Sequence, residues 1–457
     1  MLPAAIFIRR SESAGPRFAP RARTLPLPHC LGRTKRMALL DLIYVPLAIV
    51  TAPWWAGKKR SGWAERLGKT PPLPPGTKPR VLIHAVSVGE VNALRELVPK
   101  LTPTCEVVVS ATTDTGLARA QQLFAGVASV VRYPLDFSWS VRRFLDAVRP
   151  DAVGLVELEV WPNFVRQCAA RQIPVAIING RLSERSFRGY RRLAGFFRRL
   201  LGQITVVACQ DEDYATRFRA LGARRVEITG SMKWDAAVVT AGAVDGAREL
   251  GDALGVDPCK PLVVAGSTGP GEEALLHQAC PAGVQLVCAP RKPDRFDEAA
   301  AALPGCVRLS QIRAGQMVPH GNTRFLLDTI GDLRKAYSLA TVVVVGRSFM
   351  GDLYGSDPIE PIALGRATVI GPHVDDFARI VGMFADSKGI MQCPREDLGR
   401  ALATLLAEEP SRKRLIHNGL EVILTNQGAS ERHATILSKL GAKRTKTDHA
   451  NEPFGGA

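Results

Sequence analysis

Acidic and basic side chains that could do chemistry follow short apolar runs in this sequence. Glu90 comes soon after "VLIHA" and opens an apolar pattern at helical spacing. Glu157 and Glu159 follow "AVGLV", and Arg291 follows "VQLVCAP". A carboxylate can take a proton from a hydroxyl group, and a guanidinium binds phosphate or carboxylate oxygens. These residue types therefore indicate acid–base or anion-binding chemistry at the ends of strands.

Each of these side chains also has a purely structural explanation. An acid in the first helical turn, as at Glu90, stabilises the helix dipole by ~0.3–1 kcal/mol, and the dipole favours the ionised carboxylate. That form suits a base better than a general acid. Exposure to solvent explains one of the two acids, Glu157 or Glu159. Two acids beside an apolar strand are harder to explain in this way, because a buried carboxylate needs a hydrogen-bonding or charged partner. Arg291 is equally compatible with a solvated cluster.

The surrounding pattern predicts the elements that must hold these side chains. From residue 79, apolar runs alternate with amphipathic segments, and after a pause the alternation restarts at residue 262. Strands that alternate with helices indicate βαβ units and a parallel sheet. We therefore predict an α/β fold of two Rossmann-like, doubly wound domains that face a cleft. Ligands of such sheets bind outside the carboxyl ends of the strands, near helix N-termini.

The expected domain organisation has seven parts. They are a basic disordered head (1–36), a membrane-anchor helix (37–57), an N-terminal Rossmann-like domain (58–235), a linker (236–260), a C-terminal Rossmann-like domain (261–426), a C-terminal helix that packs back on the first half (427–442) and a loose tail (443–457).

Composition narrows the class of partner. The net charge is +17, and residues 1–36 carry eight Lys/Arg and one acid. The rest of the chain remains basic, which favours anionic partners such as phosphates or a lipid surface. The nine cysteines are scattered without metal spacing, so we expect neither a metal nor a disulfide framework. The sequence has no G-x-G-x-x-G motif after the first strand and no G-x-x-x-x-G-K-[ST] motif, so it lacks the glycine-rich signatures of NAD binding and of P-loop ATP binding.

Two segments suggest a membrane. Residues 38–56 form the long apolar stretch, flanked by basic residues and ending at Trp54 and Trp55. This pattern predicts an anchor that spans the membrane or lies in its interface. A secretory signal is the alternative, but no small-residue cleavage site precedes the tryptophans. Residues 185–202 interleave arginines with aromatic residues, which fits either an anionic membrane surface or a solvated helix face. Nucleic-acid binding is disfavoured because no recognition fold accompanies the charge.

Nine motifs in order give the sequence a family resemblance. They are "HAVSVGE", "ELEVWPN", "NGRLSERSFRGY", "TGSMKWD", "GSTGPGEE", "PRKPDRF", "DTIGDL", "SDPIEPIALG" and "GPH". Together they resemble the 3-deoxy-D-manno-octulosonic acid (Kdo) transferase family of lipid A biosynthesis. The resemblance implies a GT-B fold with an N-terminal membrane anchor. It also implies transfer of Kdo from CMP-Kdo to the 6′-hydroxyl of a lipid A precursor, at the cytoplasmic face of the bacterial inner membrane and without a cofactor.

The resemblance also implies roles for individual residues. The first half would hold the acceptor and the second half the CMP-sugar. Glu90 matches the general base, and Glu157 and Lys233 match residues that stabilise the transition state. The CMP-binding segments match Pro290, Arg291, Ile330, Gly331, Asp332, Asp357, Pro358, Ile359 and Glu360. Supporting residues are Ser87, Gly89, Glu159, Arg181 and Ser267.

The chain departs from the family pattern at several positions. "YGSDPIEP" places Ser356 and Asp357 where the family has His and Asn, and Gly269 replaces another His. These departures concern donor affinity rather than the fold. Two other functions stay open. One is an isomerase of the nucleotide-sugar 2-epimerase type, against which the anchor counts. The other is a non-catalytic lipid A-binding paralogue, against which the retained Glu90 and Arg291 count.

Overall fold

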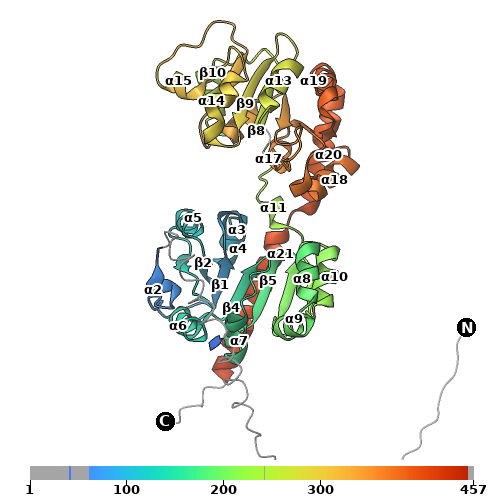
Figure 1. Cartoon of the computed structure of the whole chain (residues 1–457). Helices are drawn as coiled ribbons and strands as arrows, with labels where there is room; N and C mark the ends of the chain where they lie inside the picture. The colour runs from blue at the N-terminus through green and yellow to red at the C-terminus, as the bar shows by residue number, and fades with distance from the viewer. Residues whose placement is uncertain (1–40, 43–60, 241, 451–457) are drawn as a thin grey trace, which may run out of the picture. The chain divides into compact units, whose positions relative to one another are not determined.

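The computed structural model describes residues 41–42, 61–240 and 242–450, with side chains to residue 442. The chain separates into a unit of residues 1–58 and a unit of residues 59–457. The second unit contains two parallel sheets, each covered by helices on both faces (Figure 1). The expected α/β architecture with two parallel sheets is therefore confirmed.

The first sheet has seven strands in a doubly wound order. From one edge to the other they are β3 (Ser129–Arg132), β2 (Glu106–Ala111), β1 (Arg80–Ala85), β4 (Ala152–Val156), β5 (Val175–Gly180), β6 (Val206–Cys209) and β7 (Val226–Ile228). Its inner strands are buried along their length, as expected for a parallel sheet covered on both faces. Burying one Val or Leu side chain contributes about 1.5–3 kcal/mol.

Helices on both faces close the core of the first sheet. Residues of one face cluster with α3 (Val88–Ala93), α4 (Leu97–Leu101), α5 (Asp114–Phe124) and α21 (Ala429–Ala450). Residues of the other face cluster with α6 (Ser138–Val148), α7 (Pro162–Ala170), α9 (Ala194–Leu201) and α10 (Glu212–Ala220). Helices α2 (Trp63–Arg66), α8 (Glu184–Arg191) and α11 (Met232–Asp235) complete this half.

The second sheet repeats the doubly wound plan. Its order is β10 (Val307–Arg308), β11 (Arg324–Leu326), β9 (Gln285–Pro290), β8 (Leu262–Thr268), β12 (Val342–Val345), β13 (Ala367–Ile370) and β14 (Met391–Gln392). One face is covered by α12 (Ala247–Leu254), α15 (Leu309–Arg313), α16 (Leu333–Leu339), α17 (Ile359–Ala363), α18 (Ala378–Asp386) and α20 (Glu409–Asn426). The other is covered by α13 (Glu272–Ala279), α14 (Phe296–Ala301) and α19 (Leu398–Ala407). The 3-10 turns are η1 (Pro293–Arg295), η2 (Asp375–Phe377) and η3 (Arg395–Asp397).

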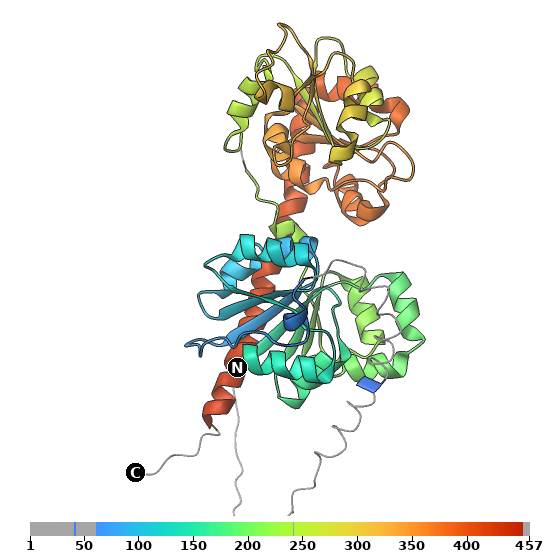
Figure 2. The same ribbon diagram turned by 60° about the vertical axis from the view of Figure 1, so that its left-hand side comes forward.

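Helix α21 returns from the end of the chain to the first sheet (Figure 2). Ala434 and Leu437 are buried in the same cluster as the strand residues. A Cβ atom on Gly154 of β4 would lie 3.1 Å from the Leu437 side chain, so a small residue there lets the helix approach. The helix continues to Ala450, past the end expected at residue 442.

Several details differ from the sequence expectation. Three short strands at the sheet edges, β7, β10 and β14, were not predicted, because two or three residues carry too little pattern. The segment expected to be a linker contains helix α12, whose Leu250 and Leu254 pack into the second core. The predicted head and anchor (1–36 and 37–57) lie outside the described residues, apart from residues 41–42. Within the part of the chain that the structure describes, no helix is long and apolar enough to cross a membrane.

Candidate active site

The strand order reverses at one point in each sheet, and the candidate residues gather there. In the first sheet the reversal lies between β1 and β4, and in the second between β8 and β12. Doubly wound sheets bind ligands outside the carboxyl ends of the strands at such points. Glu157, Ser267 and Arg347 follow or end three of these four strands, and all three have positive φ angles of 56°, 58° and 59°. Such backbone strain in non-glycine residues clusters at functional sites.

Glu90 lies after β1 in the first turn of α3. Its Oε2 accepts a hydrogen bond from the Val86 N–H at 2.9 Å, and its Oε1 accepts one from Ser87 Oγ at 2.9 Å. Ser87 Oγ in turn accepts the Glu90 N–H at 3.5 Å and so caps the N-terminus of α3. The structural role considered for Glu90 is thus present. Each carboxylate oxygen retains a second lone pair for another donor.

Glu157 and Glu159 follow β4 and are half-buried. Burial raises the pKa of Glu157, and the nearby Glu90 charge raises it further, while Arg181 and Lys233 oppose the shift. Burial and the Glu90 charge also raise the pKa of Glu159, while a hydrogen bond from Trp161 Nε1 opposes this shift. The fold thus brings the carboxylates of Glu90, Glu157 and Glu159 close enough to interact electrostatically at the carboxyl end of the first sheet. Like charges held together favour retention of a proton.

Lys233 is presented by the short helix α11. The Met232 N–H at the start of this helix donates to Asn179 Oδ1, at the end of β5, at 3.1 Å. The carboxylate of Asp235 accepts backbone N–H groups at the start of α21. The Lys233 Nζ lies 5.7 Å from the centroid of the Phe377 ring. Lys233 is therefore an exposed cation on a helix that is fixed at both ends.

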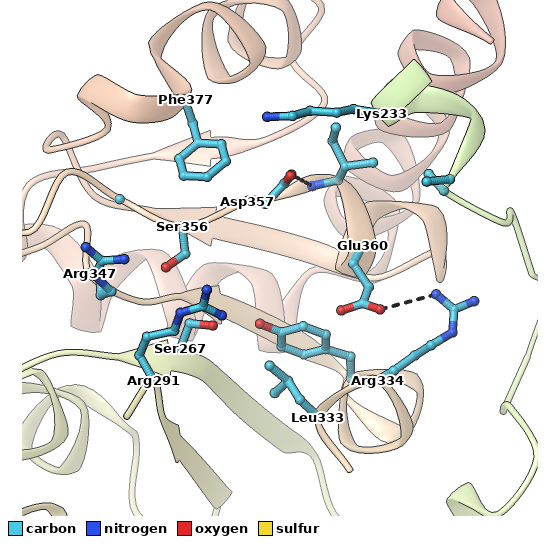
Figure 3. Close-up of a pocket in the computed structure, with 15 residues that line it drawn as sticks. Lys233, Ser267, Arg291, Leu333, Arg334, Arg347, Ser356, Asp357, Glu360 and Phe377 are labelled. Atoms are coloured by element: carbon cyan, nitrogen blue, oxygen red, sulfur yellow. Dashed lines mark hydrogen bonds and ion pairs between the residues drawn. The ribbon is translucent and has the colours of Figure 1, made fainter. Parts of the chain in front are cut away.

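A cavity of about 330 Å³ lies at the carboxyl ends of the second sheet's strands (Figure 3). Figure 3 shows Arg291, Arg347, Ser267 and Ser356 on one side of the cavity, with Glu360 and Arg334 on the other. The lining residues are Lys233, Ala236, Ala237, Ser267, Arg291, Leu333, Arg334, Tyr337, Arg347, Gly355, Ser356, Asp357, Ile359, Glu360 and Phe377. A second cavity of about 310 Å³ shares Lys233 and Phe377 with the first and includes Glu157 and Arg181.

The cations of the first cavity suit an anionic ligand. Among the residues that the structure describes, Lys233, Arg291 and Arg347 form no ion pair within 4 Å. The fourth cation, Arg334, pairs with Glu360 at 3.4 Å. The Ser356 hydroxyl is buried without a hydrogen-bond partner in the described part of the chain. Cations and a free hydroxyl of this kind bind phosphate or carboxylate oxygens.

Asp357 places an acid in the same cavity. Its Oδ1 accepts the Ile359 N–H at 3.0 Å and thereby caps α17. The side chain is exposed to the cavity, yet the surrounding protein displaces enough water to raise the pKa of Asp357. The Ile359 N–H and Lys233 oppose this shift. This acid can take a hydrogen bond from a hydroxyl-bearing ligand.

Not every predicted binding residue lines the cavity. Arg291, Asp357, Ile359, Glu360, Ser267 and Lys233 do. Asp332 instead lies buried between Arg313 and Lys335, with charged contacts of 3.0 and 3.3 Å, and accepts the Thr329 hydroxyl. Ile330 is 85% exposed, and neither it, Gly331, Pro290 nor Pro358 is among the lining residues. The cavity is lined instead by Leu333 and Arg334, the two residues that follow this turn.

Several residues that line the cavity were not predicted as site residues from the sequence, and four of them have polar or aromatic side chains of particular interest. Arg347, Tyr337, Arg334 and Phe377 all line the cavity, although only Arg347 had a usable signal, because it directly follows the strand-like run "VVVVG". Tyr337 and Arg334 lie inside α16, where an amphipathic pattern predicts packing or solvation. Only the tertiary structure brings those side chains to the strand ends.

The two doubly wound parallel sheets define the class of protein by its fold, a two-domain α/β protein with a GT-B-like fold. UDP-GlcNAc 2-epimerase from Neisseria meningitidis, solved with UDP-GlcNAc, has a TM-score of 0.52 to this chain at 12% identity, covering 80% of this chain and 100% of that one. MurG from Acinetobacter baumannii has a TM-score of 0.50 at 17% identity, covering 79% and 99%. At these identities the likeness shows the fold alone.

Sequence similarity identifies the family within that class. Residues 61–236 match the family model described as 3-deoxy-D-manno-octulosonic-acid transferase (kdotransferase). The 3-deoxy-D-manno-octulosonic acid transferase of Haemophilus influenzae is 31% identical over 87% of this chain and 95% of its own length. That of Bordetella pertussis is 31% identical over 73% and 80%. The chain therefore belongs to the Kdo transferase family and is a glycosyltransferase.

Proposed function

We propose that this protein transfers Kdo from CMP-Kdo to the 6′-hydroxyl of a lipid A precursor (lipid IVA) in lipopolysaccharide biosynthesis. One observation carries the proposal: in a chain of this family, three cations without ion pairs in the described structure, Lys233, Arg291 and Arg347, line one cavity. CMP-Kdo carries a phosphate and a sugar carboxylate, and both anions need cationic partners. The similarity to the Kdo transferases also supports the proposal that the other residues predicted to bind CMP contact the donor.

Glu90 is the proposed general base. It would take the proton of the acceptor hydroxyl as the hydroxyl oxygen attacks the anomeric carbon of Kdo. The new carbon–oxygen bond forms as the bond to the CMP phosphate breaks, and this single displacement inverts the anomeric centre. The hydrogen bonds from Val86 and Ser87 hold the Glu90 carboxylate in place for this step.

The other charged residues have electrostatic roles in this scheme. Lys233 and Arg291 would offset the charge that develops on the departing phosphate, and stabilisation of this kind supplies much of the rate enhancement in many enzymes. Glu157, whose pKa is raised, would stabilise positive charge on the sugar when ionised or donate a hydrogen bond when protonated. Glu360 with Arg334 and Asp357 would bind hydroxyl groups of the donor.

A lipid acceptor implies that the protein acts at a membrane, and we propose that this is the cytoplasmic face of the inner membrane. Helices α8 and α9 support this location. In these helices and the short link between them, Arg191, Arg192, Arg198 and Arg199 are exposed, as is Leu193 at 62%. Such a surface fits anionic lipid headgroups. Replacing these four arginines with glutamine should release the protein from anionic vesicles, with neutral vesicles as the control, and unchanged binding would contradict this role.

The decisive assay measures CMP release from CMP-Kdo with and without a tetraacyl disaccharide lipid acceptor. Release that requires the acceptor, together with a Kdo-bearing lipid product, supports the proposal. Conversion of a nucleotide sugar without any acceptor would favour the 2-epimerase type of reaction, with which the fold is shared. Binding of the lipid without turnover would instead indicate a non-catalytic lipid A-binding protein.

A further inference from the structure

One buried carboxylate joins the two strand ends that form the donor cavity. Glu272, the first residue of α13, is fully buried. Its Oε2 accepts the N–H groups of Gly269 at 2.8 Å and Arg347 at 2.6 Å. Its Oε1 accepts those of Ser348 at 2.9 Å and Phe349 at 3.0 Å. A single side chain thus satisfies four backbone donors from the loops after β8 and β12.

The loop held by Glu272 has the geometry of an anion-binding nest. Three successive N–H groups, Arg347 to Phe349, point at one carboxylate, and Arg347 has a φ angle of 59°. Such concavities of backbone N–H groups often bind phosphate. Here the protein's own carboxylate occupies the nest, so these N–H groups are not available to the anion of a donor.

The backbone of Arg347 is fixed on both sides. Its N–H donates to Glu272, and its C=O accepts the Gly355 N–H at 2.8 Å. The preceding residue must be small, because a Cβ atom on Gly346 would lie 2.7 Å from the Thr268 Cα atom. With the backbone held in this strained conformation, the Arg347 side chain lines the cavity beside Arg291 and Ser356 (Figure 3).

We propose that Glu272 is a positioning residue for donor binding, which acts by holding the Gly346–Phe349 loop so that Arg347 reaches the anion of the nucleotide sugar. This inference rests on the proposed donor cavity. Glutamine at position 272 could accept only two of the four N–H groups, because its amide nitrogen would face the other two. The loop would then relax from its strained conformation.

The neighbouring Glu273 offers a matched control. It is equally buried on the same helix, but its partners are Arg295, at 3.0 and 3.2 Å, and the Thr268 hydroxyl, at 2.6 Å. It makes no hydrogen bond to the loop after β12 in the described structure. Glu273→Gln therefore removes a carboxylate that is equally buried, but it keeps the hydrogen bond that holds the backbone of Arg347.

The experiment measures the dissociation constant for CMP and the KM for CMP-Kdo in the full chain. We expect Arg347→Ala and Glu272→Gln each to weaken CMP binding by about tenfold or more, with no further loss in the double variant. Most of the effect should appear in KM rather than in kcat. Glu273→Gln should lower the melting temperature but leave CMP affinity within about threefold. Hydrogen exchange at residues 346–349 should accelerate only in Glu272→Gln.

The outcomes separate this inference from the proposed function. Wild-type CMP affinity in Glu272→Gln, alongside weak binding by Arg347→Ala, would overturn the positioning role and leave the donor cavity intact. No effect of Arg347→Ala would refute the donor assignment itself. If Glu272→Gln does not fold, Glu272→Asp keeps the charge but shortens the reach, and unchanged affinity in that variant would equally contradict the inference.

Discussion

The carboxyl ends of the two sheets present different charged side chains on the same architecture. The first sheet presents Glu90, Glu157 and Glu159, and the Glu90 charge adds to burial in raising the pKa of Glu157 and of Glu159. The second presents Arg291 and Arg347, which have no ion pair in the described structure. Because both sheets are seven-stranded and wound in the same way, the difference lies in the loops after the strands. The fold thus determines where the site lies, and the residues of the loops determine its chemistry.

The sharpest test of this comparison separates turnover from donor binding. Glu90→Gln keeps the shape of the side chain but removes its basicity, so kcat should fall by about 10³-fold, while the dissociation constant for CMP stays within about twofold. Enzyme kinetics and calorimetric titration with CMP measure the two quantities. A large loss of CMP affinity would mean that the first sheet's acids also serve the donor.

The two halves also differ in how they are completed, because the first depends on a helix from the end of the chain. His433 of α21 is buried, and its Nε2 accepts the Asn179 N–H at 3.2 Å. Burial lowers the pKa of His433 from 6.5 to about 4. Between these values the unfolded chain binds a proton that the folded one does not, so stability falls as the pH drops from 6.5 to 4.

We expect this linkage to contribute about 3 kcal/mol over that range. Chemical denaturation of the wild type and of His433→Gln at pH 7 and pH 4 measures it. Burial also lowers the pKa of His84, to about 3, and this histidine is present in both proteins, so the difference between them isolates His433. An equal loss of stability in both proteins would show that His433 does not couple folding to pH.

The second sheet should respond in the opposite way to the first. Arg291→Ala removes one of the two arginines beside Ser356, so CMP binding should weaken by about 10- to 100-fold, the value of one or two charge-assisted hydrogen bonds. Its melting temperature should change little, because the side chain is exposed. Arg295→Ala is a poor substitute, since Arg295 is buried against Glu273. Unchanged CMP affinity in Arg291→Ala would break the charge comparison.

The smallest expected effect concerns the cost of grouping the acids. The pKa of Glu157 is raised, so its ionised form opposes folding at neutral pH, and this opposition grows as the pH rises through the raised value. Glu157→Gln should therefore stabilise the protein by up to about 1 kcal/mol at pH 7.5 and lower activity at the same time. Thermal unfolding at pH 7.5 and pH 4 tests the sign, and greater stabilisation at pH 4 would refute it.

The sequence supported much of the fold and part of the candidate site. Apolar runs of four to seven residues locate the central strands β1, β4, β8 and β12, because strands buried on both faces leave a continuous pattern. Residues directly after such runs, such as Glu157 after β4 and Arg291 after β9, could be assigned to strand ends for the same reason. Edge strands of two or three residues leave no such pattern, and helix α12 was taken for a linker.

The sequence by itself determined the alternation of strands and helices, the acids and cations that follow the strands, and the family. Only the tertiary structure decided that Arg347 and Tyr337 share a cavity with Arg291, that Asp332 pairs with neighbouring cations, and that Glu272 fills the nest after β12. The physical reason is that periodicity reports which face of an element is buried. Which side chains meet is set by strand order and loop conformation, which join residues far apart in the chain.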